Sequence, residues 1–386
     1  MLEDRTLFLK VEGNVDQTAE QLNFVSSNIG IDGMNLNLNG NLNYSENTRV
    51  DVTLNSENAD LKKAIALLPV TIRSNLNRFE ISGNSRLAGS INGTISSINT
   101  PFYDFDFSIE NGRFNDKESP VQFKNTSLSG KISNGAERSL STTSLELESF
   151  ETTTAEGSIT GKLNISNFKK PVYEYVGKVN FDLHETLELF KITELTQAKG
   201  KAIANLSVKG ELTEVGAYTL NDWKRSKVQG ELLLDDLTFG FKSRPQVISS
   251  LIGQLSFNNN SLDISELSVN IDQTNLLAKG KLNNLIAFLL DDQEPLFVDA
   301  NLSSNYIHLG ELLAAKPSEI QENDDESYSL NISPRITVYI SLLADELEFN
   351  KFQLKDLKGN LIVKNERIDA RGISFASQET GSTCLA

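Results

Sequence analysis

The sequence has few residues of the kinds that carry chemistry. Among 386 residues there are one cysteine, Cys384, and two histidines, His184 and His308. A single thiol excludes an internal disulfide and a cysteine-based metal cluster, and two histidines without HExxH spacing make a poor metal site. P-loop, GxSxG and dinucleotide-binding glycine motifs are missing as well. We therefore assign no catalytic residue, no metal and no cofactor, and we expect that the protein is not an enzyme.

Positive charge and long apolar runs are also scarce. The 36 basic residues against 52 acidic ones give a net charge of −16, without a basic block. This argues against nucleic acid, whose phosphates must be neutralised, and against tight electrostatic binding to an anionic membrane. The longest apolar cluster, Leu285 to Leu290, is much shorter than the roughly 18 residues that span a bilayer. Because Leu7, Leu9 and Val11 already alternate, we expect the chain to be an excerpt of a longer protein.

A strand, a short helix and a longer strand follow one another between Val176 and Leu212. Small or apolar residues first occupy every second position, which places them on one face of an extended segment. From Asp182 the apolar spacing changes to three or four residues, as on a short amphipathic helix. From Gly200 the period of two returns. Looser copies of this unit fill the chain, so we expect a mainly β fold.

The longest alternating run extends from Phe79 to Ile95, over 17 residues. A typical strand has about 5–6 residues. The run is therefore either a hairpin whose two strands keep the same phase, or one unusually long, curved strand.

Three short segments with helical spacing interrupt the strands. They lie near residues 58–68, 181–190 and 305–313. We interpret residues 1–373 as one continuous repetitive β region, which contains a polar acidic loop at 316–327, and residues 374–386 as an unpatterned tail.

Glycine recurs in phase with the apolar rows, as at Gly83, Gly161 and Gly280. In a strand, glycine marks a bend, a bulge or the close approach of another group. The apolar face of each strand needs cover, which a second sheet or a closed barrel would provide. Alternatively, a row of glycines would let a long sheet curl into a groove with room inside. The glycines could equally relieve crowding in a tightly curved, closed sheet.

Carboxylates are numerous but poorly arranged for chemistry. The runs Asp291 to Glu294 and Asn323 to Glu326 lack the glycine and the terminal glutamate of a calcium-binding EF-hand, so we interpret them as solvated loops. A carbohydrate-active enzyme would need clustered carboxylates on one face. Asp104 and Asp106 are two residues apart and therefore lie on the same face of a predicted strand. We interpret this face as exposed to solvent.

Several strand motifs share a glycine, a polar residue and a leucine, as in Gly161-Lys-Leu163, Gly280-Lys-Leu282 and Gly359-Asn-Leu361. Together with the inserts FDLHETLELF and NYIHLGELL, they resemble the AsmA-like family of Gram-negative bacteria, in its Asn-rich Bacteroidetes-type form, which is related to the TamB-like lipid-transfer proteins with repeating β-grooves. The resemblance covers residues from about 20 to 370.

The resemblance implies a long curved antiparallel sheet that forms a U-shaped, apolar-lined β-groove with a few short helical inserts. Members of the family are anchored in the inner membrane by an N-terminal helix, which this chain lacks, and extend into the periplasm. There they are thought to carry phospholipid toward the outer membrane and so to contribute to its biogenesis. The implied partners are phospholipid acyl chains and the inner membrane.

An apolar face without catalytic residues agrees with passive conduction of lipid. The candidate groove-lining residues are in-phase apolar members of the strands, namely Leu36, Leu38, Ile81, Leu87, Ile91, Phe105, Phe107, Leu206, Val208, Leu255, Phe257 and Leu361. The alternative is a structural or adhesive extended β protein, a solenoid or a sandwich, with a dry core and no lipid cargo.

Overall fold

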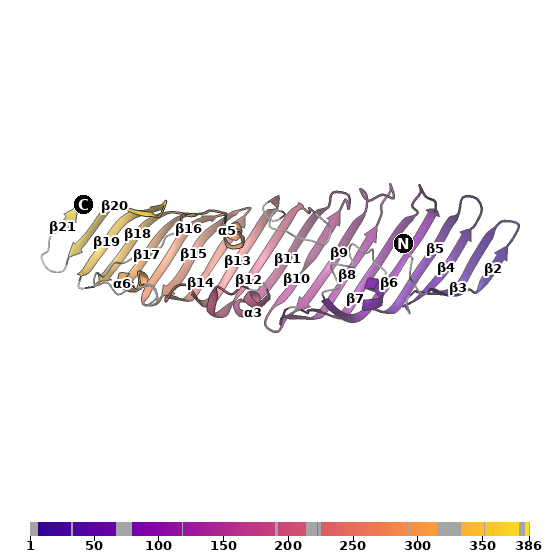
Figure 1. Ribbon diagram of the computed structural model, residues 1–386, viewed down its shortest axis with the longest axis horizontal. Coiled ribbons are helices and arrows are strands. Elements are labelled where there is room, and N and C mark those ends of the chain that lie inside the picture. The colour runs from indigo at the N-terminus through magenta and orange to yellow at the C-terminus, as the bar shows by residue number, and fades with distance from the viewer. Residues whose placement is uncertain are drawn as a thin grey trace. The chain divides into compact units, whose positions relative to one another are not determined.

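The computed structural model describes residues 7–31, 34–66, 79–117, 119–189, 192–213, 222, 225–291, 293–314, 333–350, 352–377 and 383–385. Most of these residues lie in strands, and a few short helices join them (Figure 1). The expected mainly β fold with short helical inserts is thus confirmed. The chain divides into two compact units: unit 1, Met1–Val179 with Ser207–Ser226, and unit 2, Asn180–Leu206 with Lys227–Ala386.

In unit 1 the strands from β3 to β10 pair antiparallel with their neighbours in chain order. Both β1 and β2 pair with β3 and form the edge of this sheet. Helix α1 (Leu61–Ala66) connects β5 to β6. The strands that begin in unit 1 are β1 (Leu7–Lys10), β2 (Gly13–Asp16), β3 (Gln21–Ile31), β4 (Met34–Asn43), β5 (Arg49–Asp60), β6 (Phe79–Thr94), β7 (Phe102–Asp116), β8 (Gln122–Ser133), β9 (Ser144–Thr153), β10 (Ser158–Ser166) and β11 (Val172–Asp182).

In unit 2 the strands from β13 to β17, and again from β18 to β21, pair antiparallel in chain order. Between the two sets, β17 and β18 pair parallel. The remaining elements are α3 (Leu183–Leu189), β12 (Leu195–Glu211), β13 (Lys227–Phe241), β14 (Val247–Asn258), β15 (Ser261–Ile271), β16 (Thr274–Asn283), α5 (Leu285–Leu290), β17 (Leu296–His308), α6 (Leu309–Leu312), β18 (Ile336–Phe349), β19 (Phe352–Lys364), β20 (Arg367–Ser377) and β21 (Thr383–Leu385).

The three predicted helical segments each contain a helix. They are α1, α3 and α6, although residues 305–308 of the third segment belong to strand β17. The chain forms a further helix, α5, from six consecutive apolar residues, whose pattern alone does not separate a helix from a buried strand. The predicted acidic loop at 316–327 lies outside the described residues. In the tail, β20 continues to Ser377.

The long alternating run is one strand. Strand β6 extends from Phe79 to Thr94, over 16 residues, and pairs along its length with β5 and β7. Of the two interpretations of this run, the single long strand is therefore correct.

The strands bend at β-bulges, where one strand gains a residue over its partner. At several bulges the extra residue has a left-handed backbone with φ near +50° and is not glycine. These residues are Ser26, Asn111, Asn125, Asp236, Ser250 and Asp356, and each falls in a register shift of its strand pair. A bulge bends its strand and increases the local twist.

The bulge at Asp236 gives a test of this arrangement. Asp236 is exposed and has φ 49°, a conformation that aspartate tolerates better than a β-branched residue does. Replacement by valine should therefore lower the free energy of unfolding by about 1–2 kcal/mol, as measured by urea denaturation. Asp236→Gly should keep the stability within about 0.5 kcal/mol of the parent.

The matched control is Asp235→Val, because Asp235 is an equally exposed neighbour in a strand that favours valine. Equal losses in the Asp235 and Asp236 variants would show that the left-handed backbone is not the cause.

Candidate functional site

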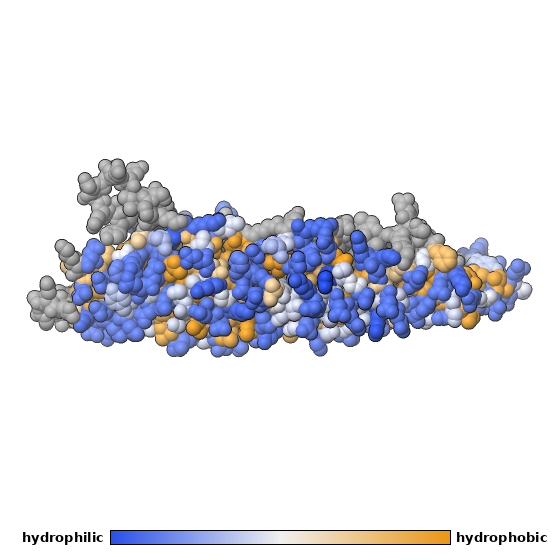
Figure 2. Space-filling model, turned by 90° about the horizontal axis from the view of Figure 1, so that it is seen from below, coloured by the Kyte–Doolittle hydropathy of each residue, from blue (hydrophilic) through white to orange (hydrophobic). Residues whose placement is uncertain are grey.

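One face of the sheet in each unit is apolar. Strand β4 shows this most plainly, because Met34, Leu36 and Leu38 are buried while the asparagines between them are exposed. Successive side chains of a strand point to opposite faces, so the leucines share one face and the asparagines the other. Hydrophilic residues cover much of the surface seen in Figure 2, with hydrophobic residues in patches between them.

The buried clusters on this face are built from neighbouring strands. In unit 1, one cluster contains Met34, Leu36 and Ala59, and the next contains Leu38, Val50 and Val52. Their buried members all come from β4 and β5, and partly buried residues of β3 and β6 pack against them.

In unit 2 the clusters also include residues of short helices. One cluster is centred on Leu255 and Ile264, and Leu183 of α3 and Leu285 of α5 pack against it. The other is centred on Leu347, with α6 packed against it. None of these clusters in the described part of the chain joins strands of two facing sheets. Neighbouring strands and short helices therefore cover the apolar face.

The predicted lining residues are all buried or half-buried. Leu36, Leu38, Val208 and Leu255 are between 4% and 7% exposed. The half-buried ones are Ile81, Leu87, Ile91, Phe105, Phe107, Leu206, Phe257 and Leu361.

Several of these residues come together. Leu87 packs against the cluster of Leu36, Ile91 packs against that of Leu38, and Phe257 packs against that of Leu255. Leu87 also lies directly opposite Phe107 in the pairing of β6 with β7. By contrast, the other six lining candidates belong to none of the four clusters, namely Ile81, Phe105, Phe107, Leu206, Val208 and Leu361.

Side chains of adjacent strands occupy the space above some of the in-phase glycines. A Cβ on Gly130 would lie 2.9 Å from Cζ of Phe107, and a Cβ on Gly89 would collide with the ring of Phe105. Gly161 would meet Cε2 of Tyr175 at 2.7 Å. At Gly89 and Gly130 a backbone carbonyl oxygen of the neighbouring strand would lie even closer to the added Cβ, so the absent side chain relieves crowding with both the backbone and an aromatic ring.

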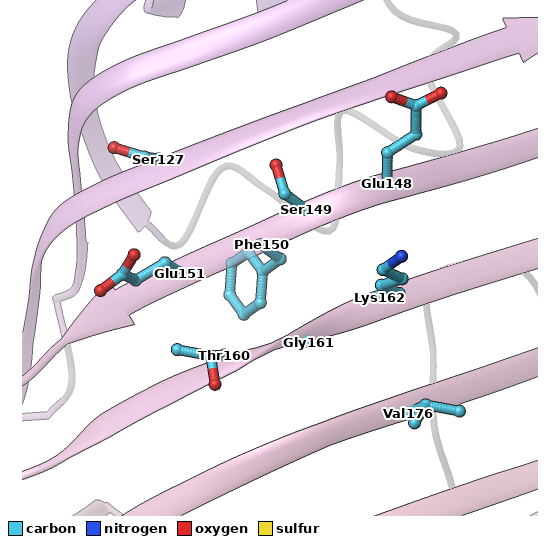
Figure 3. Close-up of a pocket in the computed structure, with 9 residues that line it drawn as sticks. All are labelled: Ser127, Glu148, Ser149, Phe150, Glu151, Thr160, Gly161, Lys162 and Val176. Carbon is cyan, nitrogen blue, oxygen red and sulfur yellow. The ribbon is translucent and has the colours of Figure 1, made fainter.

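A pocket of about 460 Å³ lies where the pairing of β8, β9 and β10 slips by a residue. Figure 3 shows Phe150 directed from β9 toward Gly161, while Glu148 and Lys162 point the other way. None of the predicted lining residues borders this pocket, which is lined by Ser127, Glu148, Ser149, Phe150, Glu151, Thr160, Gly161, Lys162 and Val176. The pocket therefore lies apart from the predicted lining residues, and its surface is mostly apolar although most of the residues around it are polar.

The carboxylate pair noted in the sequence has a basic neighbour. Nζ of Lys131 lies 2.9 Å from Oδ2 of Asp104. The hydrogen bond that Lys131 donates to Asp104, together with the attraction of that carboxylate and of Asp106, raises the pKa of Lys131 above its usual value. Asp106 is exposed, as predicted for the solvent-facing side of the strand, whereas Asp104 is half-buried.

His184 lies in helix α3, and His308, the last residue of β17, directly precedes helix α6. The backbone N–H of Glu311 donates to Nδ1 of His308 at 3.0 Å, so His308 caps the start of α6. On α3, Nε2 of His184 lies 3.5 Å from Oε1 of Glu188. The described residues contain no group of three histidine, cysteine or acidic side chains that could hold a metal ion. Within the same residues, no helix is long and apolar enough to cross a membrane.

Comparison of the chain with protein-family models, with curated proteins and with solved structures found no match.

The sequence reasoning missed the bulges and helix α5. A signal for the bulges was present, since the apolar residues of β13 change phase between Leu234 and Leu237, across the bulge at Asp236. An apolar row that shifts by one residue predicts such a bulge, because every later side chain would otherwise point to the wrong face.

The crowding at the glycines can be tested at Gly359 on β19. A Cβ there would collide with Cδ1 of Ile373 on β20, and the other atoms of Ile373 are at least 3.3 Å away. Gly359→Ala should therefore lower the free energy of unfolding by about 1–3 kcal/mol through overpacking, as measured by chemical denaturation.

Ile373→Val removes the colliding carbon, so the double variant should regain most of that loss. By itself, Ile373→Val should cost about 0.5–1.5 kcal/mol. Strictly additive effects of the two substitutions would show that the side chain of Ile373 is not what keeps this position a glycine.

Proposed function

We propose that this chain binds phospholipid acyl chains along the apolar face of its sheet and conducts them between the inner and outer membranes of a Gram-negative cell envelope, in support of outer-membrane biogenesis. The observation that carries the proposal is the composition of the apolar clusters. Each cluster in the described residues draws on neighbouring strands, with or without a short helix, and most predicted lining side chains remain half-buried.

A half-buried apolar face is chemically suited to hydrocarbon. Covering the remaining apolar surface is worth about 25 cal/mol per Å², and this attraction has no directional requirement. An acyl chain could therefore exchange one leucine or phenylalanine neighbour for another as it moves. Such movement needs no nucleophile, metal or cofactor. The resemblance of the strand motifs to AsmA-like proteins supports the same proposal, with the periplasm as the proposed location.

A second candidate function is that of a structural or adhesive β protein with a dry core. The low exposure of Leu36, Val208 and Leu255 favours it, as do the aromatic rings that occupy the space above Gly89 and Gly130. In that case the face would be filled by the side chains of the protein alone.

The mass of the native protein distinguishes the two candidates. We expect that the chain, expressed in a Gram-negative host and purified without detergent, carries phospholipid that native mass spectrometry detects as added mass. A well-folded β protein that is free of lipid would contradict conduction and favour the structural role.

Two substitutions test whether the lipid lies on the apolar face. Ile81 and Leu361 are half-buried lining candidates outside the buried clusters. A buried charge is costly to desolvate, so Ile81→Glu and Leu361→Glu together should reduce the bound phospholipid about tenfold, which corresponds to about 1.4 kcal/mol. The β-rich circular dichroism spectrum should be retained.

The matched control is Ser82→Glu with Asn360→Glu, which places the same charges on the opposite, exposed face of the same strands. If the control pair loses as much lipid as the test pair, the apolar face is not the binding site. If the test pair unfolds, its residues belong to a packed core.

A further inference from the structure

The ends of the strands in unit 1 form two long edges of the sheet, and these two edges differ. One edge carries the turns at 44–48, 95–101 and 134–143, which join β4 to β5, β6 to β7 and β8 to β9; we call it the turn edge. The opposite edge carries α1 and the turn at 154–157. Leu61, the first residue of α1, is only 3% exposed, so this part of the opposite edge is covered.

The apolar rows of the sheet continue to the turn edge. Along β4, exposure rises from 4% at Leu36 and 7% at Leu38 to 43% at Tyr44, just beyond the strand. Along β6, Leu87 and Ile91 are half-buried, and Ile95, in the same phase, is 47% exposed. The apolar face is therefore continuous with exposed apolar residues at its edge.

Two further aliphatic residues lie in the turns themselves. Ile98 is 88% exposed and Leu140 is 62% exposed. Single exposed aliphatic residues are normal on a protein surface, but these two, Tyr44 and Ile95 all lie along one edge. Other exposed apolar residues of unit 1, such as Phe8 and Val25, lie in strands, so these four are distinguished by their position at the ends of strands and in turns.

Hydrogen bonds hold the three turns next to one another. Nδ2 of Asn134 donates to the carbonyl oxygen of Pro101 at 2.8 Å, and the N–H of Tyr103 donates to Oδ1 of Asn134 at 2.9 Å. The N–H of Ile95 donates to the carbonyl oxygen of Thr48 at 2.8 Å. The exposed apolar residues are thus presented by a row of fixed, neighbouring turns.

The charge of the turns narrows the choice of partner. Glu46, Glu137 and Arg138 are their charged residues, and the others are mostly serine, threonine and asparagine. This turn edge is polar and nearly neutral, and it carries separate exposed aliphatic residues. Such an edge offers little charge to attract a charged partner. It matches the interfacial layer of a bilayer, into which apolar side chains insert by several ångströms while polar neighbours stay at the headgroups.

We infer that the turn edge of unit 1 contacts the surface of a phospholipid bilayer, with Tyr44, Ile95, Ile98 and Leu140 inserted among the headgroups. The contact itself is independent of lipid conduction. Its further role, as the place where acyl chains reach the apolar rows of β4 and β6, rests on the proposed function.

Vesicle binding tests the contact. The parent chain should float with phosphatidylcholine vesicles, and a tenfold increase in salt should leave the bound fraction nearly unchanged, because apolar insertion is not screened as charges are. The variant Ile98→Asp with Leu140→Asp should bind at least about tenfold more weakly, because the two aliphatic side chains no longer insert and a carboxylate is costly to desolvate. The control Ala155→Asp, on the opposite edge, should bind like the parent.

Fluorescence locates the contact independently of affinity. With Trp223→Phe as background, a tryptophan introduced as Ile98→Trp should shift its emission to shorter wavelength when vesicles are added. A tryptophan introduced as Ala155→Trp should not shift. Circular dichroism of every variant shows that the fold is kept.

Three results would overturn the inference: no binding of the folded parent to vesicles, undiminished binding of the double aspartate variant, or self-association of the parent that the double variant abolishes. The last result would identify a second copy as the partner of the edge. Vesicle binding by a chain whose native mass shows no lipid would support the contact while contradicting conduction.

Discussion

The buried clusters of the described residues show how the structure keeps the apolar faces of its strands from water, mostly between neighbouring strands of the same sheet. Burying such side chains is the main favourable contribution to folding, and two packed layers are the usual means. Here the apolar clusters of the described residues join adjacent strands, with α3, α5 and α6 packed against those of unit 2. The bulges follow from this requirement, since a bent sheet shields its own inner face better than a flat one does. The side chains on the apolar face are crowded. Glycine is therefore found at positions where an aromatic ring of the next strand occupies the space of a side chain.

Apolar side chains are partly exposed both on the apolar face and on the turn edge of unit 1, and the exposed fraction is larger on the turn edge. Leu36 is nearly hidden, Leu87 is half-buried, and Ile98 is largely exposed. A structural protein would gain from hiding all three. A protein that exchanges hydrocarbon with a bilayer needs the intermediate state, in which the face is covered enough to fold and exposed enough to be attractive to an acyl chain.

The period of two determines much of the fold, and it can be read from the sequence. It predicts the strands and the side of each strand on which the twelve lining candidates lie, but it left open whether the run from Phe79 is a hairpin or the single strand β6. Short helices are predictable where polar residues interrupt the apolar spacing, as in α3, but not where every residue is apolar, as in α5. The bulge at Asp236 depends on the backbone conformation of one residue and shows itself only as a change of phase. The turn edge could not be predicted, because its exposed residues come from separate turns that approach one another through strand pairing and through the hydrogen bonds of Asn134 and Ile95.

The parallel pairing of β17 with β18 bears on the order in which unit 2 assembles. Antiparallel neighbours joined by tight turns can form as local hairpins, at a small entropic cost of loop closure. The pair that sets Leu296 beside Ile336 must instead bring together strands separated by α6 and the segment that follows it. Local hairpins on either side of this junction would form first, and their joining would be the slow step of folding. Until then, β17 and β18 would each expose an unpaired edge to other chains, so this junction is where misassembly during synthesis would begin.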